Sequence, residues 1–360
     1  MSDKAIQRPT AETLYHHELE RLREWDSGPI PPGWNLSPLA VEKFVLGDDE
    51  LDIQRKFVAQ RELVTRIIIS LATNRGAMLI GEPGTAKSWL SELLSAAISG
   101  QSTLTIQGGA ISQTSQLLYS WNEALLNTQG PCAEALIPSP IYQGMLDGQL
   151  VRFEEIARCP QHIQDAILSI MSERQIMVPE LGKDSVLFAR EGFNIIATSN
   201  SLDSGIYAMS AALKRRMNFE TIPPIRDLAD EIDVVMRESE KLIRLSGVEV
   251  KPDALTIEVL TTLFHELRNG QTLDGRSTDR LAATVMSTAE AVSVAHAMGV
   301  HAYYYGSGTM ALDNLVHFLI GAALKDNKDD RRRMKHYFET EVSIKKGEHW
   351  QQVYEQRRLL

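Results

Sequence analysis

The sequence predicts an α/β domain followed by an all-helical domain, and three observations support this. Short apolar segments alternate with helical patterns through residues 53–222, whereas only helical patterns follow residue 225. The stretch 78–88, MLIGEPGTAKS, joins an apolar strand, a glycine-rich turn and the start of a helix. That order is typical of a phosphate-binding loop in a parallel sheet. The chain has 360 residues, which is enough for two domains.

Residues 1–50 are predicted to form an N-terminal helical extension. Residues 10–25 have an amphipathic helical pattern, which ends in the breaker-rich sequence SGPIPPGW. Apolar residues recur at helical spacing over 53–73 and lead into the strand at 78–80. Three further segments are expected: a nucleotide-binding α/β core at 51–225, a helical lid domain at 226–324 and a mildly basic C-terminal helical tail at 325–360, which either packs on the lid or binds a partner.

The turn GEPGTAKS is predicted to cradle phosphate. Gly81 and Gly84 let the backbone curl so that successive N–H groups point at an anion. Lys87 would reach the β- and γ-phosphates, and the Ser88 hydroxyl would ligate Mg²⁺. Ala86 stands where glycine is usual in GxxxxGK[ST], and its methyl group is tolerated if φ stays negative. The predicted nucleotide-binding residues are Gly81, Glu82, Pro83, Gly84, Thr85, Ala86, Lys87 and Ser88.

Acidic residues follow a later strand. Strands are expected at 103–106, 149–153, 193–198 and 217–222. The strand QLVRF ends in Glu154 and Glu155. Glu154 is predicted to hold Mg²⁺ opposite Ser88, and Glu155 to orient the water that attacks the γ-phosphate.

An amide and two guanidinium groups complete the predicted chemistry. The strand FNIIAT is followed by Ser199 and Asn200, and the Asn200 amide can hydrogen-bond both the γ-phosphate and the attacking water. The sequence MSAALKRRM places Arg215 and Arg216 at the end of a short helix. Guanidinium groups suit transition-state charge on phosphate, and they commonly act on the site of a neighbouring subunit.

Between the strands the pattern is less regular. Residues 113–128 are predicted to be one helix, and the following GPCAEALIPSPIYQG a loop. Two short β patterns, 175–178 and 185–190, predict a hairpin.

These motifs resemble those of the AAA+ ATPases, and more narrowly of the MoxR-like family, over residues 53–281. GEPGTAKS resembles Walker A, and FEEIARCP resembles Walker B with Glu154 in place of the usual aspartate. IIATSN is similar to the sensor-1 strand, ALKRRM to the arginine-finger segment and GRSTDRL to sensor 2. The finger is either Arg215 or Arg216, and the second is preferred because it directly precedes the apolar position. The catalytic residues that the resemblance implies are Glu155, Asn200, Arg216, Arg215 and Arg280.

The resemblance also implies two elements that project into the pore of a ring. The region 113–142 corresponds to the helix-2 insert and 175–190 to the pre-sensor-1 hairpin. An interaction role for Tyr119, Trp121 and Tyr142 would follow, while a core role for each of these aromatic residues stays open.

The function that the resemblance implies is an ATP-driven motor that remodels a protein partner or acts as its chaperone. ATP and Mg²⁺ are the expected cofactors, a homo-oligomeric ring of six subunits the expected assembly, and a von Willebrand A-domain protein the expected partner. One alternative is a McrB-like, GTP-dependent motor subunit of a restriction system. Another is a nucleotide-gated scaffold with little hydrolysis, which Glu155 and Asn200 disfavour.

Composition and charge limit these classes. The formal net charge of −10 would repel a nucleic-acid backbone, so direct nucleic-acid binding is not expected. The two cysteines have no CxxC spacing, which predicts a reduced, cytoplasmic protein. The longest aliphatic run, 67–72, is too short to span a bilayer, so no membrane span is expected.

Overall fold

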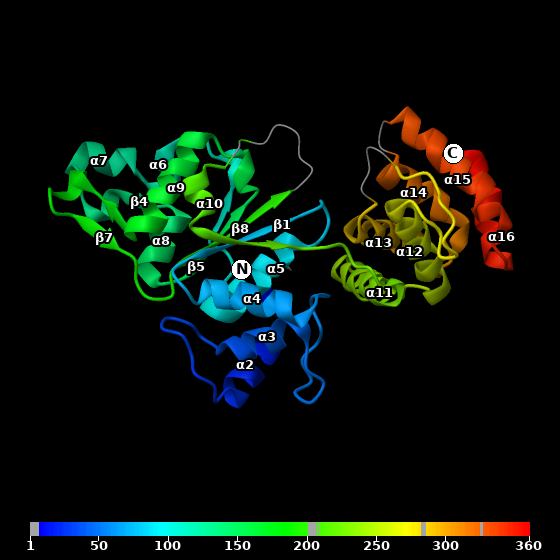
Figure 1. The fold of residues 1–360 in the computed structure, drawn as a ribbon, viewed down its shortest axis with the longest axis horizontal. Helices are drawn as coiled ribbons and strands as arrows, with labels where there is room; N and C mark the ends of the chain where they lie inside the picture. The colour runs from blue at the N-terminus through cyan, green and yellow to red at the C-terminus, as the bar shows by residue number, and fades with distance from the viewer. Residues whose placement is uncertain (1–6, 201–206, 208, 282–285, 325–326) are drawn as a thin grey trace. The chain divides into compact units, whose positions relative to one another are not determined.

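The computed structural model describes residues 7–200, 207, 209–281, 286–324 and 327–360 (Figure 1). The chain divides into two compact units. The α/β unit comprises Arg8–Gly81 and Ala86–Ile222. The helical unit comprises mainly Pro223–Leu360, and the short turn Glu82–Thr85 is grouped with it. The division between the two falls at Pro223, close to the expected end of the core at 225.

A five-stranded parallel sheet forms the centre of the α/β unit, as the sequence predicts. Its order is β2-β5-β8-β1-β9, and each neighbouring pair runs parallel. The strands are β1 (Gly76–Gly81), β2 (Thr105–Gln107), β5 (Leu150–Glu154), β8 (Asn194–Asn200) and β9 (Met217–Thr221). A parallel order of this kind requires crossovers, and the intervening helices supply them.

Helices cover both faces of this sheet because successive strand side chains point to opposite sides. On β1, Ala77 and Leu79 belong to one core cluster, and Met78 between them belongs to another. The first cluster includes residues of α3 (Pro38–Leu46), α4 (Arg61–Leu71) and α5 (Lys87–Ser99). The second includes residues of α8 (Pro140–Asp147) and α9 (Gln161–Glu173). The carboxyl ends of the strands therefore lie between two layers of helices.

The N-terminal helices are part of the first core cluster. Leu19 and Leu22 of α2 (His16–Trp25) and Phe44 of α3 are fully buried there, beside residues of α4 and α5. The sequence predicts a helical extension over 1–50 but no particular helix at the position of α3, which begins with a proline. Ser37 caps this helix by accepting a hydrogen bond from the amide of Ala40, and proline is well suited to the first helical position.

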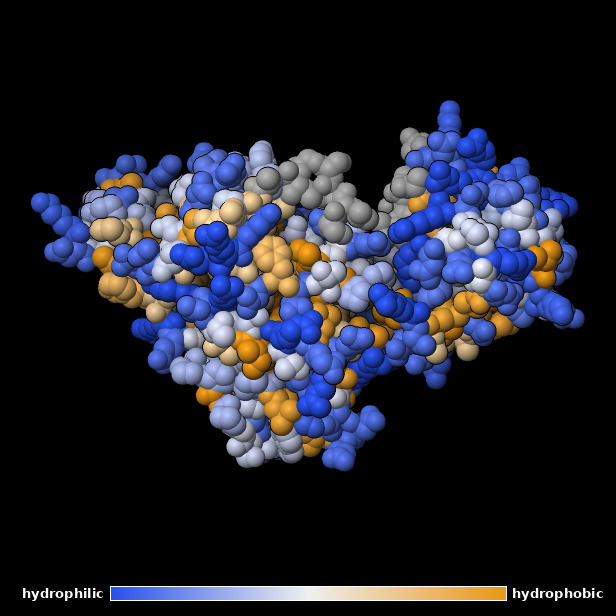
Figure 2. Space-filling view, viewed as in Figure 1, coloured by the Kyte–Doolittle hydropathy of each residue, from blue (hydrophilic) through white to orange (hydrophobic). Residues whose placement is uncertain are grey.

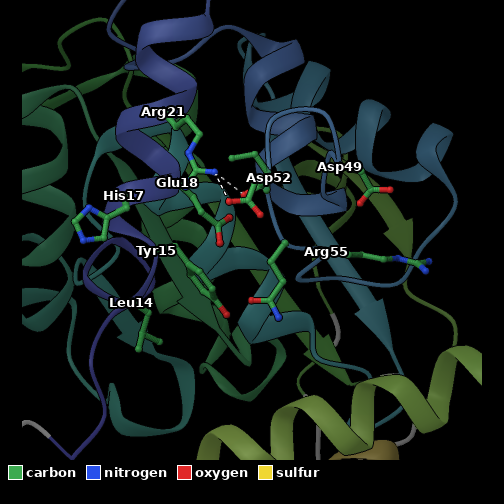
Figure 3. Close-up of a pocket in the computed structure, with 10 residues that line it drawn as sticks. Leu14, Tyr15, His17, Glu18, Arg21, Asp49, Asp52 and Arg55 are labelled. Atoms are coloured by element: carbon green, nitrogen blue, oxygen red, sulfur yellow. Dashed lines mark hydrogen bonds and ion pairs between the residues drawn. The ribbon is translucent and has the colours of Figure 1, made fainter.

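A groove of about 660 Å³ lies beside α2 and the loop 49–55 (Figure 3). Arg21 and Asp52 pair across it at 2.6 Å. None of its lining residues comes from the phosphate loop or from the ends of the sheet strands. The groove is therefore separate from the predicted nucleotide site.

The expected helix over 53–73 is shorter than its apolar pattern suggests. Only α4, Arg61–Leu71, is helical. Ile53 instead pairs with Asp48 in a β-bridge, and the Lys56 ammonium group donates hydrogen bonds to the carbonyls of Phe44 and Gln54. These tertiary contacts hold the segment before α4 in a non-helical conformation.

The region 113–147 also differs from its prediction. The expected single helix is broken into α6 (Thr114–Leu118), β3 (Tyr119–Trp121) and α7 (Glu123–Gln129). α6 ends at Leu118, where β3 begins its pairing with β4, and Asn122 then caps α7, because its side chain accepts hydrogen bonds from the first amides of that helix. The expected loop contains β4 (Leu136–Pro138), which pairs with β3, and the helix α8.

The predicted hairpin is present and contacts this insert. β6 (Gln175–Met177) and β7 (Val186–Phe188) pair antiparallel. Tyr119 packs edge-on against Trp121 and Tyr142, and its hydroxyl donates to Glu180 Oε2 at 2.9 Å. Burial, and then the Glu180 carboxylate, raise the pKa of Tyr119 to about 12. The three aromatic residues thus pack on one another and join the insert to the hairpin segment.

Exposed apolar residues lie on both of these small sheets. Ile137 on β4, Met177 on β6 and Phe188 on β7 are each about half exposed or more. Figure 2 shows orange and tan side chains among hydrophilic ones over this part of the α/β unit.

The helical unit has one core of its own. Its helices are α11 (Leu228–Leu245), α12 (Ala254–Asn269), α13 (Thr288–Tyr304), α14 (Leu315–Ala323), α15 (Lys328–Thr340) and α16 (Glu348–Glu355). The sequence pattern also predicts a helix over 276–298. Residues 276–281 are not helical, residues 282–285 lie outside the described residues, and α13 begins at Thr288, where Ser287 and Glu290 form a capping box. Tyr337 and Phe338 of α15 belong to the core, so the tail packs on the lid. No helix in the described parts of the chain is long and apolar enough to cross a membrane.

A buried charge network joins three of these helices. Glu231 of α11 accepts hydrogen bonds from Arg268 of α12 at 2.6 and 2.7 Å and from Thr288 of α13 at 2.7 Å. Burial opposes the charge of Glu231, but hydrogen bonds from His265 and Arg268 outweigh it and lower the pKa of Glu231. The Glu231 carboxylate is therefore ionised at neutral pH.

Candidate nucleotide-binding site

The candidate site is built where three central strands end. Gly81, the last residue of β1, pairs with Asn200, the last residue of β8. Glu154 is the last residue of the adjacent strand β5. The loops that follow these carboxyl ends are where parallel α/β sheets bind ligands.

The phosphate loop connects β1 to α5. Gly84 has φ +78°, a backbone conformation that residues with a side chain rarely adopt. The Thr85 hydroxyl donates a hydrogen bond to the Glu82 carbonyl at 2.9 Å. Lys87 is the first residue of α5, and its ammonium group donates to the Gly81 carbonyl at 3.2 Å. The positive end of the helix and a lysine therefore lie together at the end of β1.

Ala86 corrects the expectation of a negative φ. Its φ is +59° and its ψ is 28°, so this alanine occupies the left-handed region directly before α5. A side chain in that region costs about 1 kcal/mol relative to glycine. The loop therefore keeps the backbone shape that glycine would allow, at the expense of local strain.

Replacing Ala86 by glycine is expected to stabilise the α/β unit by about 0.5 to 1 kcal/mol, because the left-handed strain exceeds the gain in unfolded-state entropy. The measurement is the midpoint of urea unfolding. Ala96→Gly, in the interior of α5, is the matched control and should destabilise by about 1 kcal/mol. If both glycine variants destabilise equally, strain at Ala86 is not significant.

Glu154 is surrounded by hydrogen-bond donors. It is 5% exposed, and its Oε2 accepts from the hydroxyls of Ser88 at 2.5 Å and Thr198 at 2.7 Å. Its Oε1 accepts from the Ser91 hydroxyl at 2.8 Å and from Arg152 Nη2 at 3.0 Å. Burial alone would raise the pKa of Glu154, but these hydrogen bonds and the arginine charge lower it. The carboxylate is therefore ionised at neutral pH.

Ser88 and Glu154 fit a magnesium site. A hydroxyl and a carboxylate are the hard oxygen ligands that Mg²⁺ prefers, and nucleotide phosphates and waters normally complete its shell. The glutamate side chain, which is one methylene longer than that of the usual aspartate, contacts Ser88: Ser88 Oγ and Glu154 Oε2 lie 2.5 Å apart. Within the described ranges, no group of three or more His, Cys, Asp or Glu side chains could hold a metal ion.

Glu155 lies next to this cluster in a strained turn. Its φ is +54°, its amide donates to Thr198 Oγ1 at 3.1 Å, and its carboxylate pairs with Arg158 at 3.1 Å. A Cβ on Gly108 would lie 2.3 Å from the Glu155 carbonyl, so only glycine fits there. Strain of this kind is typical of functional sites.

Arg215 and Arg216 lie at the opposite end of the sheet. The Arg216 carbonyl accepts from the amide of Gly76, the first residue of β1, and its Nε donates to the Ser172 hydroxyl. β1 then runs about 17 Å to Gly81, at about 3.3 Å per residue. Neither arginine therefore lies at the phosphate loop of its own chain. A residue that acts on the site of a neighbouring subunit is expected to lie away from its own site.

Arg280 belongs to the helical unit. It is exposed, and its carbonyl accepts a hydrogen bond from Arg333 Nη1 at 2.8 Å. Its sensor-2 role remains a prediction, as do the catalytic roles of the other residues.

The sequence reading missed three residues that contact Glu154. Thr198 bridges Glu154 and the Glu155 amide, and Ser91 and Arg152 hold the other carboxylate oxygen. Two of the three have a signal in the sequence, because Thr198 and Arg152 are polar residues inside apolar strands, whereas Ser91 has none. A charged residue within a buried strand needs a partner, and here Glu154 is that partner.

Two family models match the chain. The AAA domain (dynein-related subfamily) model matches residues 76–217, and the YehL-like AAA+ ATPase C-terminal domain model matches 229–360. YehL of Escherichia coli (strain K12) is 51% identical over 99% of this chain and 98% of its own length. Chaperone MoxR1 of Mycobacterium tuberculosis is 24% identical over 58% of this chain and 51% of its own.

Among solved structures, NtrX from Brucella abortus in complex with ADP matches with a TM-score of 0.47 and 11% identity. That match covers 84% of this chain and 64% of NtrX. Because the similarity to YehL is high over nearly the whole length, and family models match both units, the chain belongs to the YehL-like group of the MoxR-like AAA+ ATPases.

Proposed function

We propose that this protein hydrolyses ATP with Mg²⁺ and uses the energy to remodel a protein partner. The observation that carries the proposal is the 2.5 Å contact of Ser88 with Glu154 at the strand ends, beside Lys87 and Glu155. A lysine, a hydroxyl and two carboxylates in this arrangement are the groups that P-loop hydrolases use.

Each residue has a distinct task in this proposal. The loop amides and Lys87 bind the phosphates, and Ser88 and Glu154 would hold the metal ion. When bound, Mg²⁺ neutralises charge on the phosphates. Glu155 orients the attacking water and accepts its proton, while Asn200 hydrogen-bonds the terminal phosphate from the next strand. Asn200 adds no charge, so it positions both groups without repelling the nucleotide.

The proposed assembly is a homo-oligomeric ring of six subunits, and its proposed partner is a von Willebrand A-domain protein. Similarity to a chaperone, MoxR1, supports a remodelling role. The exposed Ile137, Met177 and Phe188 offer apolar contacts for a protein. The position of Arg216, away from its own phosphate loop, supports an active site shared between subunits.

The purified protein is expected to hydrolyse ATP in preference to GTP and without DNA or RNA. The net charge of −10 disfavours a nucleic-acid cofactor. Phosphate release is measured with each nucleotide, with and without duplex DNA at physiological salt. A clear preference for GTP, or turnover that depends on DNA, would instead indicate a restriction-type motor. Turnover absent under every condition, with ATP still bound, would indicate a scaffold.

A further inference from the structure

Arg152 is a buried cation that the proposed reaction does not yet use. It lies on β5 two residues before Glu154, so both side chains lie on the same face of the strand. Only 7% of Arg152 is exposed. Its guanidinium donates to Ser91 Oγ at 3.0 Å, to the carbonyls of Ser88 at 3.0 Å and Ser102 at 3.2 Å, and to Glu154 Oε1 at 3.0 Å. One side chain thus holds the carboxylate and the first turn of α5.

A second buried carboxylate shares this cation. Glu92 on α5 is 3% exposed, and its Oε2 lies 3.6 Å from Arg152 Nη1. Its other contacts come from the N-terminal segment: Arg8 Nη2 lies 2.8 Å from Oε2, and the Ala11 amide donates to Oε1 at 3.2 Å. Two buried acids are therefore balanced by two arginines, one in the sheet and one in the N-terminal segment.

The N-terminal segment contacts the network at a second point. The Glu12 carboxylate accepts from the amide of Ser102 at 3.2 Å and from its hydroxyl at 2.8 Å. The carbonyl of the same serine accepts from Arg152. Segment 8–12 therefore contacts two of the groups that surround the guanidinium.

We propose that Arg152 is a positioning residue for the nucleotide site, because it holds the Glu154 carboxylate in place, and that the docked segment 8–12 keeps the Arg152 guanidinium beside Glu154. This inference rests on the proposed function. When Arg8 leaves, Glu92 retains Arg152 as its cation, and the guanidinium moves toward Glu92 and away from Glu154. The N-terminal segment thereby controls the metal-side carboxylate from outside the nucleotide site.

The principal test compares Arg152→Met with the parent protein. At saturating ATP and Mg²⁺, kcat should fall by about tenfold or more while KM for ATP stays within about threefold. The Mg²⁺ concentration for half-maximal turnover should fall by about threefold or more, because a cation that opposes Mg²⁺ is gone. A residue needed only for folding would lower the amount of active protein and leave the magnesium dependence unchanged.

Two milder variants test the same inference in case Arg152→Met does not fold. Arg152→Lys keeps the charge and should retain the parent's magnesium dependence, with a lower kcat because lysine lacks the planar fork. Arg8→Ala changes a side chain that is 77% exposed, so the fold should persist. It should shift kcat and the magnesium dependence in the same direction as Arg152→Met, but less. Combined with Arg152→Met, it should add almost nothing.

Arg66→Ala is the matched control. Arg66 forms a bidentate pair with Glu220 at 2.8 Å in the same unit, whereas the hydrogen bonds to Glu154 come from Ser88, Ser91, Arg152 and Thr198. This variant should keep the parent's kcat and magnesium dependence. Equal effects of Arg66→Ala and Arg8→Ala would overturn the role of the N-terminal segment.

Binding of a fluorescent ATP analogue at varied Mg²⁺ gives a readout that does not need turnover. Arg152→Met should bind the analogue at lower Mg²⁺ than the parent does. An unchanged or raised magnesium requirement in folded Arg152→Met, or a parent-like kcat, would overturn the inference. Failure of the proposed function looks different, because the parent itself would then hydrolyse no ATP while the binding measurement still tests Arg152.

Discussion

Replacing Glu155 by glutamine should reduce ATP turnover by about 10² to 10⁴ while leaving ATP bound, because the amide cannot accept a proton from the attacking water. Lys87→Ala should instead abolish nucleotide binding. The lysine is 6% exposed at the start of α5, where its charge lies beside the phosphate loop. The measurements are ATP affinity and phosphate release for each variant.

The structure makes this pair of variants informative. Glu155 contacts Arg158 and Thr198, whereas the metal-side residue Glu154 makes the hydrogen bond to Ser88. Glu134→Gln, at an exposed glutamate elsewhere in the α/β unit, should retain the parent rate. Hydrolysis by Glu155→Gln at the parent rate would show that the catalytic base lies elsewhere.

The sequence predicted the strands of the central sheet well, because β1, β5 and β8 are buried and consist mainly of apolar residues. The strand predicted at 217–222 is found at Met217–Thr221, and the hairpin at 175–190 is found with its two strands. Segments that depend on tertiary contacts were predicted poorly. The contacts of Lys56 with the carbonyls of Phe44 and Gln54 hold the segment before α4 out of a helix. The pairing of β3 with β4 interrupts a helix that the apolar pattern alone would continue, and Asn122 caps the helix that follows.

The positions of several candidate site residues relative to one another were predictable, because they follow a recognisable spacing along the strands. Gly81, Glu154 and Asn200 do lie together, since all three end neighbouring strands. The left-handed φ of Ala86 could not be read from the sequence, because the loop and α5 together impose it. The contacts of Arg152 with Ser91 and Ser88 join residues about sixty positions apart, and no local pattern encodes such a pairing.

A mixture of two inactive variants should recover activity if the proposed ring has shared sites. Arg216→Ala keeps Lys87, Ser88 and Glu155 but removes a cation from the neighbour's site. Glu155→Gln has an inactive site and still offers Arg216. Each alone should be nearly inactive, since an arginine finger is worth about 10³ or more in turnover. The two proteins are dissociated, mixed in several ratios, reassembled with ATP and assayed.

The expected recovery follows from the position of Arg216 beside Gly76, at the end of β1 that is farthest from its own phosphate loop. In mixed rings some interfaces combine an intact site with an intact arginine, and turnover should be greatest near equal proportions. Repeating the mixture with Arg215→Ala decides between the two arginines, because only the variant that lacks the finger is complemented. If activity stays at the baseline of the single variants across all ratios, in assemblies confirmed by size, Arg216 does not act on a neighbouring subunit.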